Sequence, residues 1–263
     1  MTESNSGTLG YIRSLIADLR ETMAHSPADR RAVVTLIAGC VLVLVFGLWG
    51  RPGFLRGDNL DAAAALVGVD RTSEYYRLIS YLYWAVTSVL VRILAPCLVI
   101  WLILKERPGD FGYRVRGTAK HAWIYLVLFV AMLPVVAAVS LTQSFQIKYP
   151  MYGQAILGWH HFIPYEIAYG IQFFGVEAFF RGFLTFGLYQ RFGYYALLVM
   201  VIPYSMVHFG KPPLEVFAAI PAGLLLGFLA LRTGSWLYGA LLHWAVGITM
   251  DLAAILQKGG FQG

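Results

Sequence analysis

Long apolar runs separated by short polar stretches make up most of the chain from residue 33 onward. Several of them approach or exceed the length needed to cross the roughly 30 Å of hydrocarbon in a bilayer. They are Val33–Trp49, Leu78–Leu104, His121–Leu141, Ile163–Leu188, Tyr194–Phe209, Leu214–Leu231 and Ser235–Leu256. The fifth run is short and contains Pro203, which suggests a broken, tilted or re-entrant segment. The pattern predicts an all-α fold, a polytopic transmembrane bundle of about seven membrane helices, with six to eight as the range.

The composition is typical of a membrane protein. Of the 263 residues, 59% are hydrophobic and 13% are charged, whereas about a quarter are charged in soluble domains. The mean hydropathy is +0.65. The net charge of +6 does not indicate nucleic acid, because the basic residues flank the apolar runs, where they set topology and meet anionic lipid head groups. We therefore expect a lipid bilayer and no nucleic acid as partner.

The positions of the basic residues predict the orientation. They gather before the first run and between the second and third runs, as Arg13, Arg20, Arg30, Arg31, Lys105, Arg107, Arg114, Arg116 and Lys120. The positive-inside rule places these segments, and the N-terminus with them, in the cytoplasm. We expect a multi-pass integral protein of a bacterial inner membrane, with a cytoplasmic amphipathic segment (1–32) before the transmembrane bundle (33–258). Apolar residues at helical spacing favour an interfacial helix in the first segment, or else an amphipathic tail: Tyr11, Ile12, Leu15, Ile16 and Leu19.

Ionisable side chains are costly inside the apolar runs, and four of those present there mark a candidate functional site. Glu177 and Arg181 are four residues apart, so a helix places them on one face, where they can pair. His208 and His243 follow in later runs. Peptide hydrolysis needs a base for water and a donor for the oxyanion, and these residue types supply both. Alternatively, the glutamate and arginine form a structural pair and the histidines satisfy backbone carbonyls.

The order of these residues resembles a known family. Glu177-Ala178-Phe179-Phe180-Arg181 is similar to the second half of the EExxxR motif of the CPBP family, which contains CAAX-prenyl endopeptidases and bacteriocin-processing proteins. Tyr204 precedes His208 by four residues, as an aromatic residue does in the second motif, and the run from Gly223 to His243 resembles the later motifs. The resemblance covers about 160–255. It implies a helical bundle with a cavity open to the membrane, in which a glutamate-activated water attacks a peptide bond.

Two positions depart from the family pattern. The first of the paired glutamates is Val176 here, and the asparagine four residues after the last histidine is Gly247. Other carboxylates offer replacements. Glu215 follows the second motif, and Asp251 lies about two turns after His243 on the same helix face. Glu166 lies three turns before Glu177 and is a weaker candidate.

The resemblance predicts an intramembrane endopeptidase that acts on a membrane-associated peptide or protein. Glu177, His208 and His243 are its expected catalytic residues, and Arg181, Tyr204, Glu215 and Asp251 support them. The alternatives are a catalytically inactive scaffold or maturation factor of the same fold, or a transporter with Arg92 on a polar path. We expect no cofactor. A glutamate and two histidines are a set that zinc accepts, but they lie on separate runs without a local zinc motif.

Two further predictions concern Arg92 and the adjacent histidines His160 and His161. Arg92 lies in the middle of the second run, so we expect it to pair with an acid such as Asp251 or Glu215, or to extend along a bent helix toward the interface. His160 and His161 follow Trp159 and are predicted to form part of an interfacial aromatic belt.

Overall fold

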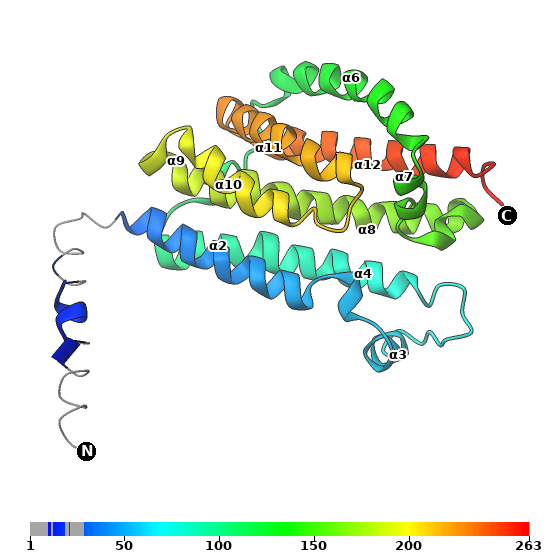
Figure 1. Ribbon diagram of the computed structural model, residues 1–263, viewed down its shortest axis with the longest axis horizontal. Coiled ribbons are helices and arrows are strands. Elements are labelled where there is room, and N and C mark those ends of the chain that lie inside the picture. Colours follow the sequence, from blue (N-terminus) through cyan, green and yellow to red (C-terminus); the bar gives the residue numbers. More distant parts are fainter. Residues whose placement is uncertain (1–9, 12, 19–20, 22–28, 263) are drawn as a thin grey trace.

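Helices joined by short turns form one bundle in the computed structural model, which describes residues 10–11, 13–18, 21 and 29–262 (Figure 1). The helices are α2 (Arg30–Trp49), α3 (Asp58–Ala65), α4 (Leu78–Ser88), α5 (Ala95–Leu98), α6 (Ala122–Ser140), α7 (Gln143–Lys148), α8 (Trp159–Glu177), α9 (Gly187–Phe192), α10 (Tyr195–Met206), α11 (Pro213–Thr233) and α12 (Leu237–Gln257). No strand occurs among these residues.

Five helices are long and apolar enough to cross a membrane: Arg30–Trp49, Leu78–Leu104, Ala119–Ser140, Pro213–Thr233 and Leu237–Gln257. The prediction of an all-α membrane bundle is therefore confirmed, and the protein is an integral membrane protein. The two remaining predicted spans are also helical. One is α8, which carries buried charges and continues through the π-helical segment η7 (Ala178–Phe186) into α9. The other is α10, whose 12 residues extend about 18 Å and are too short to cross alone. Whether these two cross fully stays a prediction.

The described part of the N-terminal segment is helical at residues 10–11, 13–18 and 21. Tyr11, Leu15 and Ile16 are exposed there. Ile12 and Leu19, which belong to the same predicted apolar face, lie outside the described residues. Placement of this segment at a membrane interface thus stays a prediction.

α8 and η7 occupy the centre of the bundle (Figure 1). α8 packs against α4 and α12, and η7 packs against α2, α10 and α11. At Gly175 an added Cβ would lie 2.1 Å from the Ser88 hydroxyl of α4, so only glycine permits this close approach. Charged side chains on the central helix are consequently covered by protein rather than by lipid.

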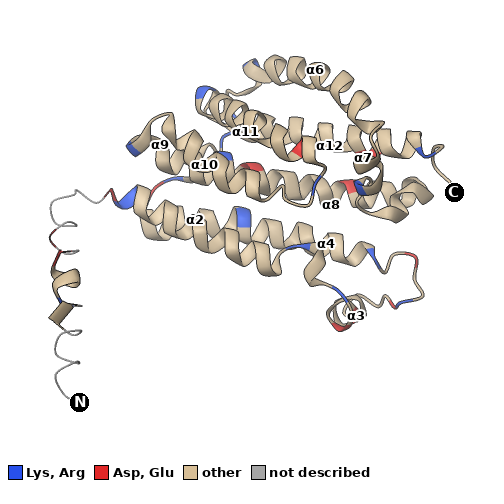
Figure 2. Cartoon of the chain, viewed as in Figure 1, with Lys and Arg blue, Asp and Glu red and all other residues tan. Residues whose placement is uncertain are grey.

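At one end of the bundle, an ion pair and hydrogen bonds connect the segments that carry most of the predicted cytoplasmic arginines. Arg31 forms an ion pair with Glu106 at 2.6 Å and donates to the Phe186 carbonyl. Ser235 donates to the Arg114 carbonyl, which attaches the 105–121 loop to the turn before α12. Figure 2 shows that charged residues concentrate toward the ends of the bundle, with few along its middle.

The predicted pairing of Arg92 with Asp251 or Glu215 is wrong. The Arg92 side chain is buried and its guanidinium lies over the Phe46 ring, 3.5 Å from the ring centroid. A cation over an aromatic face is attracted by the ring quadrupole, and this contact replaces the expected carboxylate. Both acids lie in other parts of the bundle, as described below.

Candidate functional site

Glu177 is the last residue of α8 and is fully buried. One of its carboxylate oxygens, Oε1, has two partners. Arg181 Nη1 lies 3.1 Å from it on the next turn of the same helix, and His243 Nδ1 lies 2.9 Å from it on α12. An ionised carboxylate only accepts hydrogen bonds, so the Nδ1–H of His243 is the donor. The Nε2 atom of His243 then carries its lone pair, and this side chain remains 21% exposed.

Arg181 connects this pair to the second motif. Its side chain is fully buried, and its guanidinium lies over the ring of Tyr204, 3.8 Å from the ring centroid. One side of the cation thus faces Glu177 and another faces an aromatic ring. This arrangement holds the carboxylate, the guanidinium and α10 in fixed positions.

His208 lies on the turn after α10 and is partly exposed. Its Nδ1 atom is 2.8 Å from the backbone carbonyl of Tyr204, which can only accept, so Nδ1 carries the proton. The structure thus links His243, Glu177, Arg181, Tyr204 and His208 through successive contacts. Neutral His208 and neutral His243 both present Nε2 as a hydrogen-bond acceptor.

Glu215 does not join this group. It lies in the first turn of α11 and accepts from the Tyr149 hydroxyl at 2.6 Å. Lys211 lies 3.4 Å from its other oxygen and also donates to Tyr149. Glu215 is therefore already paired with a cation outside the Glu177 cluster.

Asp251 is also separate from Glu177, and it faces Glu166 across the contact between α8 and α12. Asp251 is fully buried and Glu166 is 4% exposed. Among the described residues, no hydrogen-bond donor satisfies any of their four carboxylate oxygens. Sequence reasoning named both residues but missed the pair. Antiparallel packing of α8 on α12 would have suggested it, since Glu166 precedes Glu177 and Asp251 follows His243, about three and two turns away along the two axes.

Residues 158–249 match the family model described as type II CAAX prenyl endopeptidase, Rce1-like. This match supports the resemblance to the CPBP family that the motifs of this segment indicate. It runs from the start of α8 into α12 and contains the whole linked group from Glu177 to His243. No curated protein and no solved structure matches the chain. The family is one of intramembrane proteases, which fits the buried polar group in a membrane bundle.

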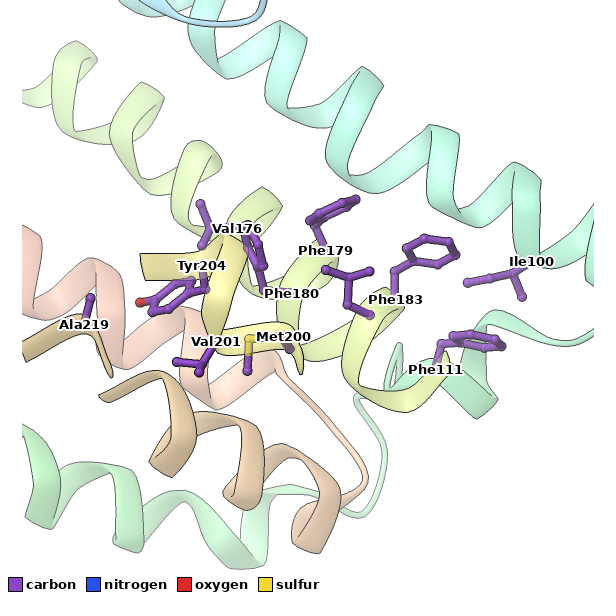
Figure 3. Close-up of a cluster of buried hydrophobic side chains, with 11 residues drawn as sticks. Ile100, Phe111, Val176, Phe179, Phe180, Phe183, Met200, Val201, Tyr204 and Ala219 are labelled. Atoms are coloured by element: carbon purple, nitrogen blue, oxygen red, sulfur yellow. The ribbon is translucent and has the colours of Figure 1, made fainter. Parts of the chain in front are cut away.

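Apolar groups surround the two positions, 176 and 247, at which the chain departs from the CPBP pattern. Val176 is buried in the cluster that contains Phe180 and Tyr204 (Figure 3). A Cβ at Gly247 would lie 2.7 Å from the ring of Phe173, and that ring packs on His243 with centroids 4.3 Å apart. Phe173 thus occupies the space that an asparagine side chain would need.

An apolar pocket of about 220 Å³ lies between α2 and the motif helices. Its lining includes Phe179 and Phe180 of η7 and Val207 beside His208, with Phe46 and Arg92 on the opposite side. Phe180 also packs edge-on against Tyr204. Phe180 thus contacts both the pocket and Tyr204 of the polar group.

Proposed function

We propose that the protein is an intramembrane endopeptidase that hydrolyses a peptide bond of a membrane-associated substrate. The observation that carries this proposal is the 2.9 Å contact between His243 Nδ1 and Glu177 in the interior of a CPBP-type bundle. A buried carboxylate behind a partly exposed imidazole is an arrangement that activates water.

In the proposed reaction His243 is the general base and Glu177 is its positioning residue. Nε2 of His243 takes a proton from water as the water oxygen bonds to the scissile carbonyl carbon. The imidazolium that forms is stabilised by the Glu177 carboxylate, which also contacts Arg181 at 3.1 Å. The same proton then passes to the amine nitrogen as the carbon–nitrogen bond breaks. Atoms and protons balance in this reaction, and it needs no redox partner and no cofactor.

His208 is proposed to stabilise the oxyanion. Because its Nδ1–H already donates to the Tyr204 carbonyl, Nε2 can donate to an oxyanion only when the ring is protonated.

The pocket beside Phe180 and Val207 suggests how a substrate is held. It is apolar and faces α2, so a lipid chain attached to the substrate fits its chemistry. We propose that a membrane-anchored peptide places its lipid in this pocket while its scissile bond reaches His243.

A catalytically inactive scaffold of the same fold is the second candidate. Val176 and Phe173 favour it, because they put apolar groups where the family pattern has a glutamate and an asparagine. This candidate needs the Glu177–Arg181 pair for stability and does not need either histidine.

Proteoliposomes with a lipidated fluorogenic peptide separate the two candidates. Glu177→Gln keeps the side-chain size and should lower kcat by about 10²- to 10⁴-fold with little change in KM, as loss of the carboxylate behind a catalytic histidine does. His243→Ala should lower activity at least as much, and His208→Ala by about 10²-fold.

The matched control is Glu215→Gln, a carboxylate paired with Lys211 away from His243, which should retain activity within about twofold. If Glu177→Gln retains parental activity and Glu215→Gln does not, the proposed role of Glu177 behind His243 is wrong. If all these variants match the parent, the measured cleavage does not come from this site, and the scaffold candidate is favoured.

The proposed orientation places the 105–120 loop and residue 25 in the cytoplasm, in a bacterial inner membrane. The attachment of that loop to the start of α2 by the Arg31–Glu106 pair supports a common side. Reporter fusions at both positions should give the same cytoplasmic signal. Opposite signals would reject this topology.

A further inference from the structure

A second polar cluster lies at the opposite end of α8 from Glu177. Glu74, His160 and His161 each offer one ligand atom there, and these atoms all lie within 4.8 Å of one another. Glu74 belongs to the loop before α4, whereas the two histidines lie in the first turn of α8. We propose that this cluster is a binding site for a zinc-class divalent cation, independent of the proposed proteolysis.

The orientation of His161 carries the proposal. Its side chain is completely buried, and its Nε2 atom has no hydrogen-bond partner among the described residues. The nearest carboxylate oxygen, of Glu74, is 3.6 Å away, which is too long for a hydrogen bond. A buried imidazole nitrogen without a partner costs free energy, and a metal ion is a partner that recovers it.

A second contact fixes the His161 ring for metal binding. The Tyr152 hydroxyl lies 3.0 Å from Nδ1. When Nδ1–H donates to this hydroxyl, the lone pair is on Nε2, which points to Glu74. Metal-bound histidines commonly have such a second partner, which sets the tautomer and the ring orientation.

The backbone around the other two ligands is also held. Gln154 donates to the backbone carbonyl of Glu74 at 3.0 Å, which fastens the loop beside α8. At Gly158, φ is +143° and a Cβ would lie 3.0 Å from the His160 ring. Glycine at this position therefore leaves room for the His160 ring beside the cluster.

Two imidazoles and one carboxylate suit zinc better than calcium or magnesium, which prefer oxygen ligands. Zinc–ligand bonds of about 2.0–2.1 Å place the atoms of a tetrahedral site about 3.4 Å apart. The side chains of Glu74 and His160 are exposed and can rotate by the small amount required. A bound ion would clamp the loop before α4 to the helix that carries Glu177.

Cobalt(II) and zinc binding to the full chain in detergent, after removal of metals with a chelator, tests the site. The parent should bind one zinc and show the visible spectrum of tetrahedral cobalt. Glu74→Gln and His160→Ala remove exposed ligands with little risk to folding, and each should raise the zinc Kd by tenfold or more. Tyr152→Phe should weaken binding by about tenfold, because the second partner of His161 is lost.

Two controls locate the ion. His121→Gln changes a histidine at the other end of the bundle and should bind as the parent does. His243→Ala should also leave the zinc Kd unchanged. The proposal is overturned if the parent binds no zinc, or if Glu74→Gln and His160→Ala bind as tightly as the parent. Loss of binding in His243→Ala alone would place the ion at the Glu177 site and overturn it as well. None of these measurements depends on proteolytic activity.

Discussion

Replacing Arg181 with alanine removes the cation that faces Glu177 in the interior of the bundle. The two charged atoms are 3.1 Å apart, and at an effective dielectric constant of about 20 their attraction is about 5 kcal/mol. The stacking of the guanidinium on Tyr204 contributes about 2 kcal/mol more at a desolvated site. Part of this is offset, because the variant no longer has to bury a guanidinium. We expect the free energy of unfolding to fall by about 3–5 kcal/mol.

The assay is unfolding in detergent, followed by tryptophan fluorescence and by the fraction of folded protein that remains after heating. Arg92→Ala is the matched control, since Arg92 is equally buried but stacks on Phe46 in place of pairing with a carboxylate. It should lose less than about 2 kcal/mol. His208→Ala, on a partly exposed turn, should also lose less than Arg181→Ala.

A double variant separates loss of the pair from loss of packing. Combining Arg181→Ala with Glu177→Gln removes the buried charge that Arg181→Ala leaves behind, so the double variant should be no less stable than Arg181→Ala alone. Equal losses of stability in Arg181→Ala and Arg92→Ala, or losses that simply add in the double variant, would refute a stabilising role for the Glu177–Arg181 ion pair.

Three further predictions test individual positions. Gly247→Asn should lower the melting temperature without raising activity, because the Phe173 ring fills the space that the new side chain needs. The added substitution Phe173→Ala should restore stability. A stable and more active Gly247→Asn variant would contradict this prediction. Val176→Glu should cost about 3 kcal/mol of stability in the detergent assay, since it buries a carboxylate in an apolar cluster; unchanged stability would show that water reaches this position. In the loop between α2 and α4, the hydrogen bond from Arg71 lowers the pKa of Asp61 to about 2. The ionised carboxylate therefore stabilises this loop fully above about pH 4, and the stabilisation is lost as the pH falls toward 2. Hydrogen exchange of the loop should stay constant from neutral pH to about pH 5 and rise below about pH 4, and a rise near neutrality would point to another group.

The length of the apolar runs and the local residue spacing were enough to predict the fold class and the Glu177–Arg181 part of the site. A bilayer requires every backbone group to be satisfied within its segment, so long apolar runs predict helices without knowledge of their packing. The Glu177–Arg181 pair was predictable for a related reason. Its geometry depends only on the i,i+4 spacing within one helix, and the structure has it at 3.1 Å.

Contacts between residues on different helices could not be predicted from the sequence and became visible in the folded structure. His243 contacts Glu177 directly, whereas His208 is linked to Glu177 and Arg181 through Tyr204. The sequence pattern does not distinguish the two histidines. The structure likewise brings Asp251 to Glu166.

The contacts of Arg92 and Glu74 were likewise not predictable from the sequence. The Arg92 guanidinium lies over the Phe46 ring, and Glu74 lies beside the buried His161. These contacts depend on the rotation and the axial position of each helix relative to its neighbours. Both are set by small-residue contacts and aromatic packing between segments far apart in the chain, so spacing within one segment does not determine them.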